Sequence, residues 1–112
     1  MNKIILIGRI TKDPELIHIN EGEGQYCRFS LAVERRYKNS EGIKEVDFIP
    51  VCTWSKSAEY VSSYIKKGDL LSISGNLRIS SYEDKEGKKK YSSEVIAEEV
   101  KKIASKKEER VN

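Results

Sequence analysis

Aromatic and basic residues occur together in several short segments of the chain. The aromatic residues are Tyr37, Phe48, Trp54 and Tyr82. The basic residues that accompany them are Arg35, Arg36, Lys56, Arg78, Lys88 and Lys90. Aromatic rings stack on unpaired bases and cations follow the phosphate backbone, so both types on exposed strands and loops are typical of single-stranded nucleic-acid binding. The pattern predicts that these residues bind an unpaired strand.

Each of these residues also has a simpler explanation. Phe48 and Trp54 share one parity in an apolar segment, and both could belong to the core, where large apolar residues are usually buried. Tyr37 and Tyr82 fall where the pattern predicts exposure, so core packing explains them less well. The lysines at 85 and 88–90 fit a solvated hairpin tip as well as a phosphate contact.

Five segments have the pattern of β-strands. The strands are expected at residues 2–10, 25–35, 45–54, 69–82 and 89–97, with residues 15–19 as a short extension of the first. Alternate residues of 25–35 form an apolar face, which consists of Cys27, Phe29, Leu31 and Val33. The corresponding face of 69–82 consists of Leu71, Ile73, Leu77 and Ile79. Pro50 is unexpected inside a strand, because proline has no N–H to donate.

Residues 55–67 have the apolar spacing of an amphipathic helix. The positions that recur at this spacing are Ala58, Val61 and Ile65. Lys66 and Lys67 suit the negative end of a helix dipole, and Gly68 suits a left-handed cap. The helix is therefore expected to end at Lys67.

The order of these elements predicts a mainly β fold. Three strands, one helix and two strands are the arrangement of an oligonucleotide-binding (OB) fold, a five-stranded Greek-key barrel with one helix between strands 3 and 4. An unrelated small α+β domain has the same order, so the order alone leaves that alternative open.

Composition restricts the classes of function. The chain has 112 residues, enough for one domain, and a formal charge of only +3, so affinity for phosphate must come from where the charges lie. Cys27 and Cys52 are expected to be buried thiols and His18 a surface strand residue. No spacing of residues suggests a metal site, a cofactor or a catalytic triad. The chain has no apolar segment of membrane-spanning length, and we expect a cytoplasmic, soluble protein that is not an enzyme.

Longer motifs of the sequence resemble the bacterial single-stranded DNA-binding protein family. The matching segments are residues 2–15 (NKIILIGRITKDPE), 29–33 (FSLAV), 47–49 (DFI), 54–59 (WSKSAE), 64–68 (YIKKG) and 78–83 (RISSYE). The resemblance covers roughly residues 1 to 100 and implies sequence-independent binding and protection of single-stranded DNA during replication, recombination and repair.

The resemblance also implies roles for particular residues. Four aromatic positions of the family stack on DNA, and they align with Tyr37, Phe48, Trp54 and Tyr82. Basic positions of the family's DNA path align with Lys56, Lys67 and Arg78. Members of the family form homotetramers, which implies that the edge of the first strand is available for pairing between subunits.

The carboxyl end departs from the family pattern. Family members usually carry a glycine- and proline-rich linker with an acidic tip that docks replication and repair enzymes, whereas residues 105–112 read SKKEERVN. We therefore expect an OB domain at residues 1–104 and a short mobile tail at 105–112. Either the sequence is a short paralogue or it is a trimmed core, and recruitment of enzymes through such a tail is not expected.

Two other functions fit parts of the pattern. A related OB module of replication restart would be a dimer, so the mass of the assembly distinguishes it from a tetramer. A barrel that binds proteins and has lost DNA binding would not need aromatic residues at all four positions. Nuclease activity ranks last, because Asp13, Asp47 and Asp69 lie on different elements and metal-dependent cleavage needs clustered carboxylates.

Overall fold

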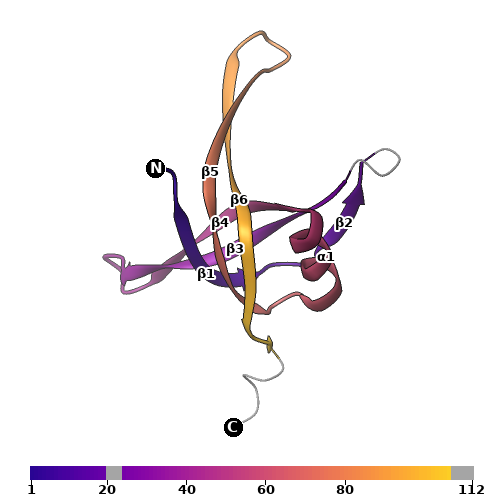
Figure 1. The fold of residues 1–112 in the computed structure, drawn as a ribbon. Helices are drawn as coiled ribbons and strands as arrows, with labels where there is room; N and C mark the ends of the chain where they lie inside the picture. Colours follow the sequence, from indigo (N-terminus) through magenta and orange to yellow (C-terminus); the bar gives the residue numbers. More distant parts are fainter. Residues whose placement is uncertain (20–23, 107–112) are drawn as a thin grey trace.

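A computed structural model describes residues 1–19 and 24–106 of the chain (Figure 1). Within these ranges the strands are β1 (Ile4–Ile10), β2 (Glu15–His18), β3 (Gln25–Lys38), β4 (Lys44–Trp54), β5 (Leu70–Glu83) and β6 (Lys89–Ala104). One helix, α1 (Ser55–Tyr64), follows β4 directly. Of the predicted tail at 105–112, only Ser105 and Lys106 lie within the described residues.

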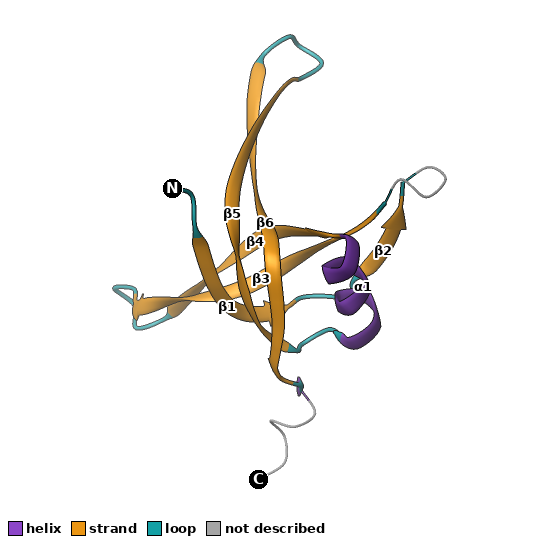
Figure 2. Cartoon of the chain, in the orientation of Figure 1, coloured by secondary structure: helices purple, strands orange, loops and turns teal. Residues whose placement is uncertain are grey.

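The strands close into a barrel. The hydrogen-bonded order is β1-β5-β6-β4-β3-β2, and an additional pairing of β1 with β3 joins the two sides. The pairing of β4 with β6 is parallel, and every other pairing of the described strands is antiparallel. The predicted OB fold is confirmed. Its helix, between β4 and β5, lies between strands 3 and 4 once β2 is counted as the extension of β1 (Figure 2).

Two glycines allow strands to approach closely where the barrel closes and bends. A Cβ on Gly8 would overlap the carbonyl oxygen of Ala32, at the place where β1 crosses to β3. A Cβ on Gly75 would overlap the carbonyl oxygen of Ile96, next to the register shift between Ser74 and Gly75. Larger side chains at either position would push the paired strands apart.

The predicted alternation of β3 is confirmed. Cys27, Phe29 and Leu31 are buried, and both cysteines, Cys27 and Cys52, are buried free thiols. The helix contributes Ala58 and Val61, and Ile65 directly follows it; all three are fully buried. His18 is exposed on β2, as predicted. No helix within the described ranges has the length and apolar character needed to span a bilayer.

The predicted end of the helix is wrong by three residues. The helix ends at Tyr64, because Ile65 already has extended backbone angles. The backbone N–H of Lys66 donates to the buried carboxylate of Asp69 at 2.8 Å, which forms a turn in place of another helical turn. Gly68, with φ of 89°, occupies that turn, and its N–H donates to the carbonyl oxygen of Ile10 at 2.8 Å. Gly68 therefore joins the turn to β1 and does not cap the helix.

The predicted burial of Leu77 and Ile79 is also wrong. Both have the parity of the buried Leu71 and Ile73, but they are exposed. The hairpin of β5 and β6 extends well beyond the barrel, as Figure 1 shows, so the core ends before it reaches these two residues. The alternation of apolar residues along β5 does not reveal where the core of the barrel ends.

The register explains why β4 tolerates Pro50. Pro50 is paired with Ser30, whose carbonyl oxygen accepts the N–H of Thr11 at 3.1 Å and so points away from β4. The backbone nitrogen of Pro50 therefore faces away from β3 and toward the side of β6. On that side, β6 pairs with β4 only from Val51 onward. No ladder hydrogen bond is lost at this position.

Candidate nucleic-acid interface

One face of the sheet carries Phe48, Trp54, Arg78, Tyr82 and Lys90 among the predicted site residues. Cys27, Phe29, Val51 and Val95 point into the core, so their strand neighbours point outward. The outward residues of β3, β4, β6 and the hairpin form what we call the outer face. The cross-strand pairs that lie on it include Ala32 with Phe48, Tyr26 with Trp54, Arg78 with Glu94, and Tyr82 with Lys90.

The four predicted aromatic residues are all exposed. Their relative exposures are 76% for Tyr37, 66% for Phe48, 43% for Trp54 and 54% for Tyr82. The explanation by core packing is therefore wrong for Phe48 and Trp54. Phe48, Trp54 and Tyr82 are exposed on the outer face, and base stacking requires exposed rings.

A fifth aromatic residue, Tyr26, was not predicted as a site residue. Its ring centroid lies 5.0 Å from that of Trp54, with an angle of 39° between the ring planes. The β3–β4 register produces this pair, because Tyr26 is directly opposite Trp54. Tyr26 alternates with the predicted apolar face of residues 25–35, but only the register of the neighbouring strand shows which residue it contacts.

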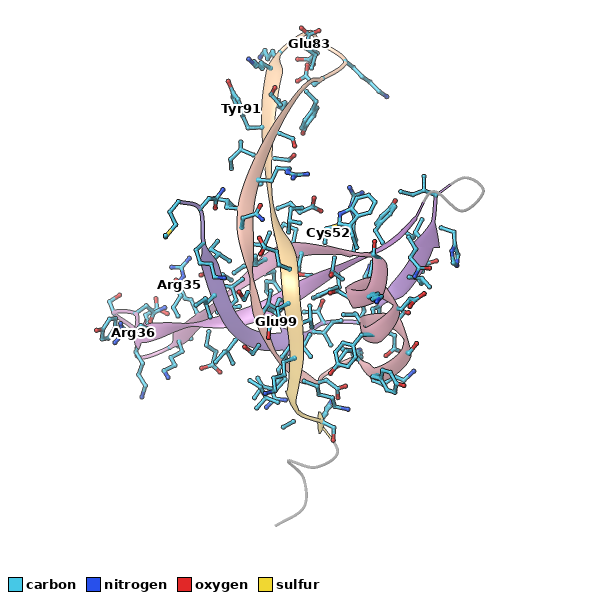
Figure 3. All side chains as sticks on the ribbon, in the orientation of Figure 1. Arg35, Arg36, Cys52, Glu83, Tyr91 and Glu99 are labelled. Atoms are coloured by element: carbon cyan, nitrogen blue, oxygen red, sulfur yellow. The ribbon has the colours of Figure 1, made fainter. Side chains whose placement is uncertain are left out.

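Tyr37 lies near the free end of the ribbon formed by β3 and β4, where the register shifts between Glu34 and Lys38. The guanidinium carbon of Arg36 is 5.5 Å from the centroid of the Tyr37 ring. Figure 3 shows Arg36 at this end of the ribbon. The two residues thus combine a ring and a cation, as predicted, at one limit of the sheet.

Arg35 lies apart from these residues. Its guanidinium forms ion pairs with Glu45 at 2.6 Å and Asp47 at 2.9 Å. The hydrogen bond to Asp47 raises the pKa of Arg35 and lowers the pKa of Asp47. Asp47 is opposite Val33 and shares the parity of the core residues, so this cluster lies on the side of the ribbon away from Phe48. The structure does not bring Arg35 to the outer face.

Arg28, Glu94 and Arg78 form a charged cluster at the centre of the outer face. Arg28 Nε lies 3.3 Å from Glu94 Oε2, and Arg78 is the cross-strand neighbour of Glu94. Cys52, the cross-strand partner of Arg28, is buried beneath them. Burial raises the pKa of the Cys52 thiol and Glu94 adds to this rise, whereas Arg28 and Arg78 oppose it.

The hairpin carries one aromatic residue and one lysine on each of its two faces. Tyr82 and Lys90 are opposite each other on the outer face. On the other face, Lys89 Nζ lies 5.7 Å from the centroid of the Tyr91 ring. Lys88 directly precedes β6, and its backbone N–H donates to Asp84 Oδ1 at 2.9 Å. Lys88 and Lys90 are both exposed, so either has a charge available at the hairpin.

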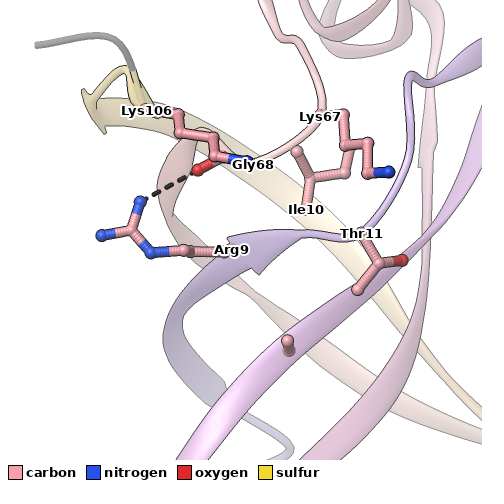
Figure 4. Close-up of a pocket in the computed structure, with 7 residues that line it drawn as sticks. Arg9, Ile10, Thr11, Lys67, Gly68 and Lys106 are labelled. Carbon is pink, nitrogen blue, oxygen red and sulfur yellow. Dashed lines mark hydrogen bonds between the residues drawn. The ribbon is translucent and has the colours of Figure 1, made fainter. Parts of the chain in front are cut away.

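The two remaining predicted lysines lie in different places. Lys56 is the second residue of α1, two residues after Trp54, and lines a cavity of about 360 Å³ with His18 and Gln25. Lys67 lies just before β5, at the opposite end of that strand from Tyr82. It lines a second cavity, of about 500 Å³, with Arg9 and other residues (Figure 4). Lys56 is therefore close to Trp54, and Lys67 shares its cavity with Ala32, the cross-strand partner of Phe48.

The sequence matches the single-strand binding protein family over residues 1–103. The chain belongs to this family.

Several bacterial members of the single-strand binding protein family are close relatives. Single-stranded DNA-binding protein 1 of Clostridium acetobutylicum is 48% identical over 108 residues, which are 96% of this chain and 98% of that protein. Single-stranded DNA-binding protein 2 of the same organism is 52% identical over 101 residues, 90% of this chain and 75% of the relative. The single-stranded DNA-binding protein of Clostridium tetani is 49% identical over 102 residues, 90% of this chain and 69% of the relative.

Proposed function

We propose that this protein binds single-stranded DNA on the outer face, without sequence preference and without a catalytic step. Bases stack on Phe48, Trp54 and Tyr82, and on Tyr37 at the end of the ribbon. The observation that carries the proposal is the exposure of these four rings, because large aromatic side chains are rarely left exposed together without a ligand or partner. Membership of the family and the names of its relatives support the same ligand.

Phosphate contacts come from the cations that border these rings. Arg36, Lys56, Arg78, Lys88 and Lys90 are the residues to which we assign this role. Lys67 extends the path to the cavity that it lines with Arg9 and Ala32, and Arg35 contributes least, because Glu45 and Asp47 already hold its guanidinium. Binding releases counterions from the DNA, so affinity falls as salt rises.

Coating of unpaired DNA is useful wherever strands are separated. We propose that this protein protects such strands in the cytoplasm of a bacterium during replication, recombination and repair. A ring that stacks on a base does not contact the hydrogen-bonding groups that distinguish one base from another. Stacking therefore accounts for binding without sequence preference.

The proposed assembly is a homotetramer that uses the edge of β1. Ile4 to Gly8 pair with β5 along one edge, and among the described residues pairing of β1 with β3 begins only at Arg9. Ile5 and Ile7 are exposed apolar residues on this strand. A second copy of β1 would cover both features. Light scattering after gel filtration distinguishes a tetramer from the dimer expected of a replication-restart module, and Ile7→Glu should lower the mass of the assembly.

Fluorescence anisotropy tests the ligand. A labelled oligo-dT of about 35 nucleotides should bind at low salt, as should mixed-sequence single strands, and the matching duplex should bind far more weakly. Equal affinity for the duplex would contradict the proposal, because the bases of a duplex are not available for stacking.

A further inference from the structure

Arg28 is placed beside the aromatic pair of Tyr26 and Trp54. Its guanidinium carbon lies 5.3 Å from the centroid of the Tyr26 ring, and that ring lies 5.0 Å from Trp54. The side chain of Arg28 is 62% exposed. A cation that is held over one ring and open to solvent is available to a phosphate of the nucleotide whose base lies on the neighbouring ring.

The partner of Arg28 holds it loosely. The ion pair joins Arg28 Nε to Glu94 Oε2 at 3.3 Å, with side-chain exposures of 62% for Arg28 and 27% for Glu94, and an ion pair open to solvent on one side is weak in water. Arg35 provides the contrast, because its guanidinium donates to Glu45 at 2.6 Å and to Asp47 at 2.9 Å. Phosphate accepts two parallel hydrogen bonds from one guanidinium, and such bidentate pairs are stronger than a single long contact. A phosphate can therefore replace Glu94 as the partner of Arg28.

The negative charge of Glu94 keeps a neighbouring positive charge when Arg28 leaves. Arg78 is its cross-strand neighbour on β5, so a second cation stays beside the carboxylate. The exchange thus leaves no isolated charge on the outer face.

We propose that Tyr26 and Arg28 form a nucleotide subsite next to Trp54, in which Glu94 holds Arg28 until a DNA phosphate displaces it. The proposal rests on the proposed function and adds to it a ring, a cation and a competing carboxylate. In the free protein Glu94 keeps Arg28 extended over Tyr26. In the complex Glu94 opposes binding, because its negative charge competes with the phosphate for the same guanidinium.

Substitutions at the three residues give different results if the subsite exists. Glu94→Gln should raise the affinity for oligo-dT about two- to fivefold, since it removes the competitor. Arg28→Ala should lower the affinity and reduce the slope of log K against log salt by about 0.7, the value for one phosphate contact on a single strand. Tyr26→Ala should weaken binding about fivefold or more, as expected for the loss of a ring from a stacking site.

Glu15→Gln is the matched control. Glu15 is opposite Arg28 on β2, so the substitution removes the same charge from the same face without removing the Glu94 contact. If Glu15→Gln raises affinity as much as Glu94→Gln does, the effect is one of general charge and the holding role of Glu94 is contradicted. The double variant Arg28→Ala/Glu94→Gln completes the test, because the gain from Glu94→Gln should disappear when Arg28 is absent.

The result that overturns the subsite differs from the one that overturns the proposed function. If Phe48→Ala and Tyr82→Ala weaken binding while Tyr26→Ala and Arg28→Ala do not, the subsite is wrong and DNA binding stands. If none of the four changes the affinity, the outer face is not the binding surface. Circular dichroism and thermal unfolding of each variant establish that it is folded.

Discussion

The rings of Tyr26 and Trp54 lie 5.0 Å apart because the β3–β4 register places the two residues directly opposite each other on the outer face. The planes of the two rings are inclined to each other by 39°, so the rings form two adjoining surfaces and not one flat surface. Trp54 is the last residue of β4 and immediately precedes α1, so its backbone is fixed by both elements. The outer face therefore presents two adjoining aromatic rings where β4 meets α1.

Removal of a stacking ring should weaken DNA binding without unfolding the protein. Trp54→Ala, Phe48→Ala and Tyr82→Ala should each raise the Kd for oligo-dT about 5- to 150-fold, which corresponds to about 1–3 kcal/mol per stacked base. Anisotropy titrations measure the change. Tyr64→Ala is the control, since Tyr64 is exposed on α1 and packs against Tyr60, away from the outer face. An equal loss in the control would show that the effect is not one of stacking.

The two arginines at 35 and 78 should differ in their effect on salt dependence. Arg78→Ala should reduce the slope of log K against log salt by about 0.7, because one phosphate contact is lost. Arg35→Ala should leave the slope nearly unchanged, since its guanidinium is paired with Glu45 and Asp47 on the other side of the ribbon. A larger slope change for Arg35→Ala than for Arg78→Ala would contradict the assignment.

The buried thiols should make the fold sensitive to alkaline pH. Burial raises the pKa of both Cys27 and Cys52 above the ordinary value. A raised pKa in the folded state means that the stability from each neutral thiol is complete below the unfolded pKa and is lost as the pH rises toward the folded pKa. Urea unfolding should therefore show lower stability at pH 10 than at pH 8.

The double variant Cys27→Val/Cys52→Val provides the control for this pH effect. Its stability should change less between pH 8 and pH 10, because valine does not ionise. An unchanged alkaline loss in the variant would assign the effect to other groups.

Gly75 should be intolerant of any side chain. Gly75→Ala places a Cβ against the carbonyl oxygen of Ile96 and should destabilise the fold by about 1–3 kcal/mol, as overpacking does. Ser74→Ala, the neighbouring position on the same strand, should change stability much less. Thermal unfolding of both variants tests this, and equal stability of Gly75→Ala and the wild type would contradict the close approach of β5 and β6.

The order of the elements and the family resemblance allowed the barrel to be predicted, and the local pattern allowed the exposure of Tyr37 and Tyr82 to be predicted, whereas core packing stayed open for Phe48 and Trp54. The alternation around Phe29 marks a half-buried strand, and the aromatic positions fall in familiar motifs. The exposure of Ile79 was not predictable, since a pattern of alternate residues does not reveal how far a hairpin extends beyond the core. The contact of Tyr26 with Trp54 and the ion pairs of Arg35 depend on strand register, which no single segment contains.

Trp54 is the only tryptophan of the chain, so its fluorescence reports directly on the outer face. The measurement that tests DNA binding on this face most directly is a titration with oligo-dT, and in parallel with a duplex of similar length, across a series of salt concentrations. We expect strong quenching by the single strand, weaker at high salt, and little quenching by the duplex. Binding of oligo-dT with no change in Trp54 fluorescence, or no binding at low salt, would contradict the proposed use of the outer face.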